Sequence, residues 1–125
     1  MSHRHDLLND RNVKRFFRSL QNPTLLFVWW ATPCNTMSRA RKDDGGPPPL
    51  RSDTYPLGIP GLQGAQLRKV QQANRLVTVT ALGLELAHSC GAASVLENPH
   101  RSRLWEIPRL LAALQRIGAD SVYLD

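Results

Sequence analysis

The sequence predicts an α/β fold with a partial parallel sheet, flanking helices and one long loop rich in proline and glycine. Two observations lead to this fold class. Short apolar segments rich in β-forming residues alternate along the chain with longer segments of helical periodicity. The chain also has 125 residues, of which 42% are hydrophobic, and this suits a single domain with a core of its own.

An amphipathic helix is the first expected element and covers residues 6–21. Its apolar side chains recur at helical spacing, and its basic side chains occupy the other face. The apolar set is Leu7, Leu8, Val13, Phe16, Phe17 and Leu20, and the basic set is Arg11, Lys14, Arg15 and Arg18. Asn22 and Pro23 end this helix.

Residues 24–32 form a continuous apolar run, which predicts a strand buried on both faces with Trp29 and Trp30 in the core. Pro33 ends the strand. A connection over residues 35–64 follows, and its tract of glycine and proline excludes regular structure. Loops of this length inside a compact domain are usually functional or disordered.

Residues 65–90 have the periodicity of a long helix that ends at Gly91. A second short strand is expected at 92–96, then a helix over 107–117 with Pro108 in its first turn, and a third strand at 121–124. Strands that alternate with helices imply a parallel sheet covered on both faces. The sequence thus predicts a partial, Rossmann-like sheet in one domain over residues 1–125.

All of the excess positive charge lies in the first third of the chain. The formal net charge is +6; residues 1–42 contain eight basic and two acidic residues, and residues 43–125 contain eight of each. A basic segment beside a neutral body suits a polyanion, so nucleic acid is the expected partner. The alternative is a solvated basic helix and loop.

Two cysteines, Cys34 and Cys90, form neither a disulfide framework nor a zinc motif, so no metal is expected. The longest apolar run is too short to cross a bilayer, and the first residues lack the apolar stretch of a signal peptide. The sequence therefore predicts no membrane association and an intracellular location, in the nucleus or the cytoplasm.

Reactive or polar residues follow the first two predicted strands. Cys34 comes after Pro33, and Glu97 and Asn98 come directly after Leu96. Carboxyl ends of parallel strands share one edge of a sheet, so a single small substrate would reach both Cys34 and Glu97. A thiol and a carboxylate there suit attack on a heterocycle: the thiolate adds to a ring carbon while the acid holds a ring nitrogen. Partial burial of Glu97 would help it to hold a proton.

Basic and hydroxyl side chains follow both strand ends and suit contacts with phosphate and an extruded base. They are Ser38, Arg39, Arg41 and Arg101. Plainer roles remain open for the same region. Cys34 would then be a small buried residue, and Glu97 would be an N-cap or part of a salt bridge. Asn98 would cap the turn before Pro99, and Trp105 would be a packing residue and not a base-stacking platform. Arg39, Arg41, Lys42 and Arg51 would belong to a solvated loop.

Several separated motifs carry a family resemblance: Thr-Pro-Cys-Asn-Thr-Met-Ser-Arg-Ala-Arg at 32–41, Gly-Pro-Pro-Pro-Leu-Arg at 46–51, Asn74, and Glu-Asn-Pro-His-Arg-Ser-Arg-Leu-Trp at 97–105. They resemble a group of uncharacterised sequences found mainly in algae and dinoflagellates. Those sequences are similar to cytosine-5 DNA methyltransferases, with which they share a Pro-Cys and a Glu-Asn motif. The resemblance covers about residues 24–125.

This resemblance implies a methyltransferase-like domain that uses S-adenosylmethionine as the donor. Cys34 would be the nucleophile on cytosine carbon 6, Glu97 would contact the base, and Asn98 would help to position the loop. Asn74 would contact the cofactor, whereas Ser38, Arg39, Arg41 and Arg101 would contact the substrate.

Three departures from the family pattern shape the expectation. Thr32 stands where the enzymes have a proline, Pro99 stands where they usually have valine, and no strand with a glycine-rich loop precedes residue 24. Family members also continue beyond the point where this sequence stops. We therefore expect the central part of a domain, inactive alone if the cofactor half is missing, with a second polypeptide as the partner that completes it. The alternatives are a non-catalytic nucleic-acid-binding remnant of a mobile element or truncated gene, and an unrelated small α/β protein in which Cys34 is structural.

Overall fold

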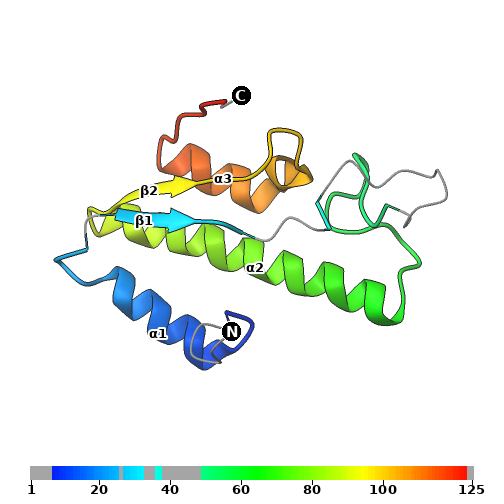
Figure 1. Ribbon diagram of the computed structural model, residues 1–125, viewed down its shortest axis with the longest axis horizontal. Helices are drawn as coiled ribbons and strands as arrows, with labels where there is room; N and C mark the ends of the chain where they lie inside the picture. The colour runs from blue at the N-terminus through cyan, green and yellow to red at the C-terminus, as the bar shows by residue number, and fades with distance from the viewer. Residues whose placement is uncertain (1–6, 26, 33–35, 38–48, 124–125) are drawn as a thin grey trace.

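The structure is a computed structural model that describes residues 7–25, 27–32, 36–37 and 49–123. The elements are α1 (Asp10–Leu20), β1 (Phe27–Trp30), α2 (Gly64–Ser89), β2 (Ala93–Leu96), the 3-10 helix η2 (Arg103–Glu106) and α3 (Pro108–Arg116). β1 and β2 pair in parallel, and α2 lies between them in the sequence (Figure 1). The protein therefore has a small α/β fold, as the alternation of apolar and helical segments predicts.

α1 begins where the predicted amphipathic pattern meets a capping residue. The side chain of Asn9 accepts a hydrogen bond from the Arg11 amide at 2.9 Å, which satisfies one of the free N–H groups of the first turn. Leu20 is buried, and the Phe16 ring packs edge-on against Trp30 with the ring centroids 5.5 Å apart. α1 therefore packs against α2 and the inward-pointing ring of Trp30, and its basic residues are exposed to solvent.

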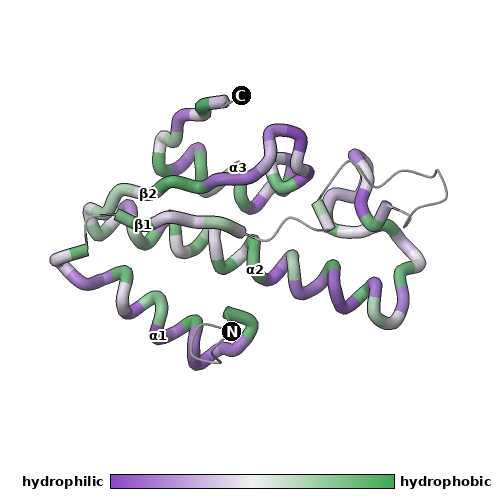
Figure 2. Tube along the Cα trace, viewed as in Figure 1, coloured by the Kyte–Doolittle hydropathy of each residue, from purple (hydrophilic) through white to green (hydrophobic). Residues whose placement is uncertain are grey.

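α2 is a helix of 26 residues. Its buried residues include a series at spacings of three and four, namely Val70, Ala73, Val77, Thr80, Leu84 and Ala87, and additional ones where the sheet covers it. Its first half is mostly polar and extends beyond the strands, whereas its second half is apolar and packs under them (Figure 2). Gly91 ends the helix with φ of +85°. The Ala92 amide bonds the Ala87 carbonyl at 2.9 Å and the Gly91 amide bonds the His88 carbonyl at 3.1 Å, so a Schellman motif turns the chain into β2.

One glycine of α2 is required by close packing against the sheet. A Cβ on Gly83 would lie 2.3 Å from Cη2 of Trp30, which is closer than van der Waals contact allows. The absence of a side chain at Gly83 therefore lets the six-membered ring of Trp30 approach the helix closely, and only 5% of Trp30 is exposed.

α3 packs against α2 through an apolar face and an ion-pair cluster. Pro108 occupies its first turn, as predicted, and Leu110 and Ala113 are buried. Glu85 of α2 accepts hydrogen bonds from Arg109 at 2.7 Å and from Arg116 at 3.0 Å. The Arg109 hydrogen bond is the main cause that holds the pKa of Glu85 below its usual value.

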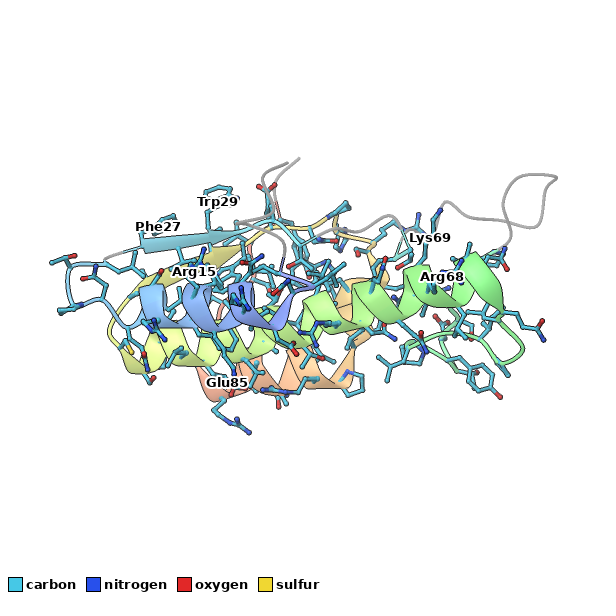
Figure 3. All side chains as sticks on the ribbon, turned by 90° about the horizontal axis from the view of Figure 1, so that it is seen from below. Arg15, Phe27, Trp29, Arg68, Lys69 and Glu85 are labelled. Atoms are coloured by element: carbon cyan, nitrogen blue, oxygen red, sulfur yellow. The ribbon has the colours of Figure 1, made fainter. Side chains whose placement is uncertain are left out.

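The structure corrects the prediction that helices cover both faces of the sheet. α2 and α3 lie on one face only, and β1 alternates between exposed and buried positions (Figure 3). Trp30 is in the core as expected, but Trp29 is 58% exposed, so its assignment to the core is wrong. A continuous apolar run cannot distinguish a strand with two covered faces from a strand with one.

The predicted third strand is also wrong for the residues that the structure describes. Residues 121–123 form no strand, and Val122 and Tyr123 are 79% and 70% exposed. Both strands described belong to one two-stranded sheet. Local β-propensity does not by itself make residues 121–123 a strand, because a strand forms only where its backbone pairs with a neighbouring strand. Within the described parts of the chain, no helix is both long and apolar enough to cross a membrane.

Candidate functional site

The ends of β1 and β2 lie side by side at one edge of the sheet. Trp30 pairs with Leu96, and the Glu97 amide donates to the Trp30 carbonyl at 3.0 Å, which continues the ladder one step past the strands. Thr32 and Asn98 therefore leave the sheet next to each other. Among the predicted site residues, Cys34, Ser38, Arg39 and Arg41 lie outside the described residues.

Asn98 connects the two strand ends. Its Nδ2 donates to the Thr32 carbonyl at 2.9 Å, across 66 residues of sequence. Thr32 is itself buried, and its hydroxyl shares a hydrogen bond of 2.8 Å with the hydroxyl of Thr80 on α2. The Oδ1 of Asn98 is buried and has no hydrogen-bond partner in the described part of the protein. Asn98 therefore connects the segment after β1 to the segment after β2 by a hydrogen bond. A residue that only capped the turn at Pro99 would make no such long-range bond.

A second hydrogen bond joins the same two segments a few residues further on. The Arg103 amide donates to the carbonyl of Met37 at 2.8 Å, and Met37 is fully buried. The residues that precede and follow Cys34 in the sequence, Thr32 and Met37, thus each bond the segment that begins at Glu97. The two sequence motifs, Pro33-Cys34 and Glu97-Asn98-Pro99, belong to segments that are joined on both sides of the cysteine.

Glu97 is exposed, so the expected partial burial of its carboxyl group is wrong. Because side chains alternate along a strand, Glu97 lies on the same face as Ala93 and Val95, whereas Asn98 points toward the helices. That outer face carries no helix (Figure 3). Glu97 is therefore accessible to a substrate.

A buried arginine fixes the segment after Cys34, and the sequence did not indicate it. Arg51 is 1% exposed, so its assignment to a solvated loop is wrong. Its Nε and Nη2 donate to the Thr36 hydroxyl at 3.3 and 3.0 Å, and its Nη1 donates to the Pro56 carbonyl at 2.7 Å. Burial lowers the pKa of Arg51 to about 10, so the guanidinium is still charged at neutral pH.

Asn74 completes this network from α2. Its Oδ1 accepts from Nη1 of Arg51 at 2.7 Å, and its Nδ2 donates to the Leu57 carbonyl at 2.8 Å. Both polar atoms of the side chain that the resemblance assigns to the cofactor are therefore engaged in holding the loop before α2. A lone arginine in an irregular segment has no periodic pattern, so only the fold reveals that it is buried.

The residues after Pro99 have mixed roles. Arg101 is exposed and accessible to a ligand, whereas Arg103 pairs with Asp53 at 2.7 Å and with Glu106 at 3.3 Å. The indole Nε1 of Trp105 donates to the Pro99 carbonyl at 2.9 Å. Trp105 therefore holds the turn after Asn98 in place, which favours the packing role over base stacking.

The cavity that the described residues form at the amino end of β2 is small for S-adenosylmethionine. It has a volume of about 200 Å³, Ala92, Ala93 and Ser94 line it, and it lies at the end of the strand opposite to Glu97. Small-molecule pockets usually have volumes of about 300–1,000 Å³. Gly58, Gly61 and Gly64 precede α2 and follow no strand. In the same described residues, no three His, Cys, Asp or Glu side chains gather as metal ligands would.

The sequence matches no protein-family model, no curated protein and no solved structure. The interpretation of the site therefore depends on its own geometry and on its motifs.

Proposed function

We propose that this chain is the substrate-binding part of a methyltransferase-like domain of the cytosine-5 type, built on a partial Rossmann-like sheet. One observation carries the proposal. Thr32 and Met37 lie two positions before and three positions after Cys34 in the sequence. Asn98 donates a hydrogen bond to the Thr32 carbonyl and Arg103 donates one to the Met37 carbonyl, and both donors belong to the segment of the Glu-Asn motif. A fold that joins these two motifs at the carboxyl edge of a parallel sheet supports a shared site for one base.

Each site residue has a role in this proposal. The sulfur of Cys34 adds to carbon 6 of cytosine, and the accessible carboxyl group of Glu97 contacts the base. Asn98 positions the segment before Cys34 through its bond to Thr32. The remaining polar side chains contact the nucleic-acid backbone; they are Ser38, Arg39, Arg41 and Arg101.

S-adenosylmethionine supplies an electrophilic methyl group where it is bound, but Asn74, which the resemblance assigns to it, is engaged by Arg51 and the Leu57 carbonyl. The chemistry that we assign to this chain is therefore limited to the nucleophile and the base contact. A second polypeptide that carries the donor site is the partner that the proposal requires, and the location expected for such a pair is the nucleus or the cytoplasm.

Trapping with a mechanism-based cytosine analogue tests this function. We expect DNA that contains 5-azacytosine to form a covalent adduct with the protein, with or without S-adenosylmethionine, because this chain supplies the nucleophile. Cys34→Ser should abolish the adduct, whereas Cys90→Ser should leave it unchanged, because Cys90 is an exposed free thiol near the end of α2. Absence of an adduct in a folded protein, or an adduct that depends on Cys90, contradicts the proposal.

A non-catalytic nucleic-acid-binding role is the second candidate, and the exposed basic face of α1 favours it. Arg11, Lys14, Arg15 and Arg18 are all exposed on α1, which packs against α2. In this case DNA binding should be salt-sensitive and independent of sequence, and no adduct should form. If Cys34 has only a structural role, Cys34→Ser should change stability and leave DNA binding intact.

A further inference from the structure

A cavity lies at the end of the molecule opposite to the candidate site. α2 and α3 both end there, and β2 begins there (Figure 1). Leu84 and His88 of α2, the first residues of β2 and the segment after α3 line this cavity, and its volume is about 200 Å³. A cavity of roughly 150 Å³ can hold a benzene molecule, so this cavity suits a ligand with a single ring or a short alkyl chain.

The electrostatic surroundings of the cavity favour a cation. The carboxyl ends of α2 and α3 each carry a partial negative charge from the helix dipole, and Asp120, which lines the cavity, adds a carboxylate. The nearby positive charges of α3 are paired, because Arg109 and Arg116 both bond the carboxylate of Glu85. An ammonium group is therefore favoured in this cavity over a carboxylate or a phosphate.

One polar group beside the cavity has no partner. The Oγ of Ser94 is buried and makes no hydrogen bond with the residues that the structure describes, although Ser94 lines the cavity. A buried hydroxyl without a partner costs free energy, and rotation about χ1 can direct it toward a ligand. An ammonium that donates to this oxygen satisfies it. The imidazole of His88, in its neutral form, offers a second acceptor in the same cavity.

We propose that the cavity at the amino end of β2 binds a small primary amine in its ammonium form. The ammonium donates hydrogen bonds to the hydroxyl of Ser94 and to the carboxylate of Asp120, and the hydrocarbon part packs against Leu84 and Ile117. This site does not depend on the proposed function, because it lies at the end of β2 that is opposite to Glu97.

Titration with benzylamine, followed through the backbone amide signals in nuclear magnetic resonance spectra, tests the site. The amides of residues 92–94 and 117–120 should shift and saturate, with a Kd on the order of 1 mM for a ligand of this size. Benzyl alcohol and benzoate keep the ring and replace the ammonium by a neutral or a negative group. Both should bind at least about fivefold more weakly than benzylamine.

Two variants test the assigned contacts. Ser94→Ala should weaken benzylamine binding about tenfold, because it removes a hydrogen bond to a charged group, and it should fold normally because the lost hydroxyl is unpaired. Asp120→Asn should weaken binding about threefold, since Asp120 is exposed. Thr78→Ala and Asp53→Asn remove an exposed hydroxyl and an exposed carboxylate outside the cavity, so affinity should not change.

Three results would overturn the inference: amide signals that do not shift, equal or tighter binding of benzyl alcohol or benzoate, or unchanged affinity in Ser94→Ala or Asp120→Asn. The failure of this inference is distinct from that of the proposed function, because the adduct is formed by Cys34 and the amine is bound at the other end of the sheet. Each experiment can therefore fail while the other succeeds.

Discussion

Gly83 shows how one residue type sets the distance between α2 and the sheet. The indole of Trp30 fills the space that a Cβ on Gly83 would occupy, 2.3 Å from Cη2. Trp30 is rigid and packed against Phe16 on its other side, so it has little room to shift. A buried tryptophan and a helical glycine therefore form one packing unit, although they are separated by 53 positions in the sequence.

Gly83→Ala is expected to destabilise the protein. Overpacking of a core costs about 1–3 kcal/mol, which exceeds the roughly 1 kcal/mol that alanine gains over glycine in a helix. Urea unfolding should show a lower midpoint with an unchanged slope. Thr78→Ala, at an exposed position of the same helix, should change the free energy of unfolding by less than about 0.5 kcal/mol. Equal or greater stability of Gly83→Ala would mean that the Trp30 contact is looser than the structure shows.

Arg51→Lys is the corresponding test for the buried polar network. The planar guanidinium donates hydrogen bonds to Thr36, Pro56 and Asn74, and a lysine ammonium cannot donate to all three in the same geometry. We expect the free energy of unfolding to fall by about 2 kcal/mol, because acceptors are left unsatisfied in the interior. Arg101→Lys, at an exposed position, is the matched control and should have little effect. A neutral result for Arg51→Lys would show that water can replace the lost donors.

At the scale of elements, the pairing of α2 with α3 contains a charge cluster that responds to pH. Arg109 and Arg116 donate to Glu85, which lowers the pKa of this carboxyl group from its usual 4.5. A carboxylate with a lowered pKa in the folded state stabilises the protein above about pH 4.5. It loses that contribution as the pH falls through the folded-state value.

Glu85→Gln should therefore remove part of the acid sensitivity of the protein. We expect the variant to be less stable than the wild type at pH 7, with a difference that shrinks toward pH 3. Thermal unfolding across this range measures the difference. Asp120→Asn, which changes an exposed carboxylate, should follow the wild-type curve. A stability difference that is constant with pH would show that Glu85 acts by packing and not by charge.

The elements also show how far local patterns determine this fold. Helical periodicity and Gly91 predict α2 to within a residue, and the long connection that contains α2 is what the parallel pairing of β1 and β2 needs. The exposure of Trp29 could not be predicted, because it depends on which face the helices cover. The burial of Arg51 depends on its contact with Asn74, which is 23 positions away in the sequence.

For the candidate site, the sequence predicted which segments meet but not how they meet. The Pro-Cys and Glu-Asn motifs lie at strand ends, and parallel pairing brings those ends together. The bonds from Asn98 to Thr32 and from Arg103 to Met37 join specific backbone atoms, and sequence patterns do not determine such pairs. The accessibility of Glu97 follows from the uncovered sheet face, which only the complete packing reveals.

At the scale of the whole molecule, the uneven charge predicts how salt affects DNA binding. Replacement of Arg11, Lys14, Arg15 and Arg18 by glutamine should reduce the slope of log affinity against log salt by about 2–3 units, because each phosphate contact to a single strand contributes about 0.7. Arg68→Gln with Lys69→Gln removes two exposed charges from the first turns of α2. If the Arg68→Gln, Lys69→Gln control reduces the slope by as much for each charge removed as the α1 replacements do, the basic face of α1 does not bind DNA preferentially.

The length of α2 has a consequence for how the molecule opens. At 1.5 Å per residue, its 26 residues span about 39 Å, roughly three times the length of a four-residue strand. The second half is clamped between the sheet and α3, but residues 64–69 at its start are all exposed. Amide hydrogen exchange should therefore differ along this one helix. The amides of its first turns should exchange fast, whereas those of residues 77–87 should exchange only when the whole protein unfolds. Uniform protection along α2 would show that the loop before it locks the whole helix into a single cooperative unit.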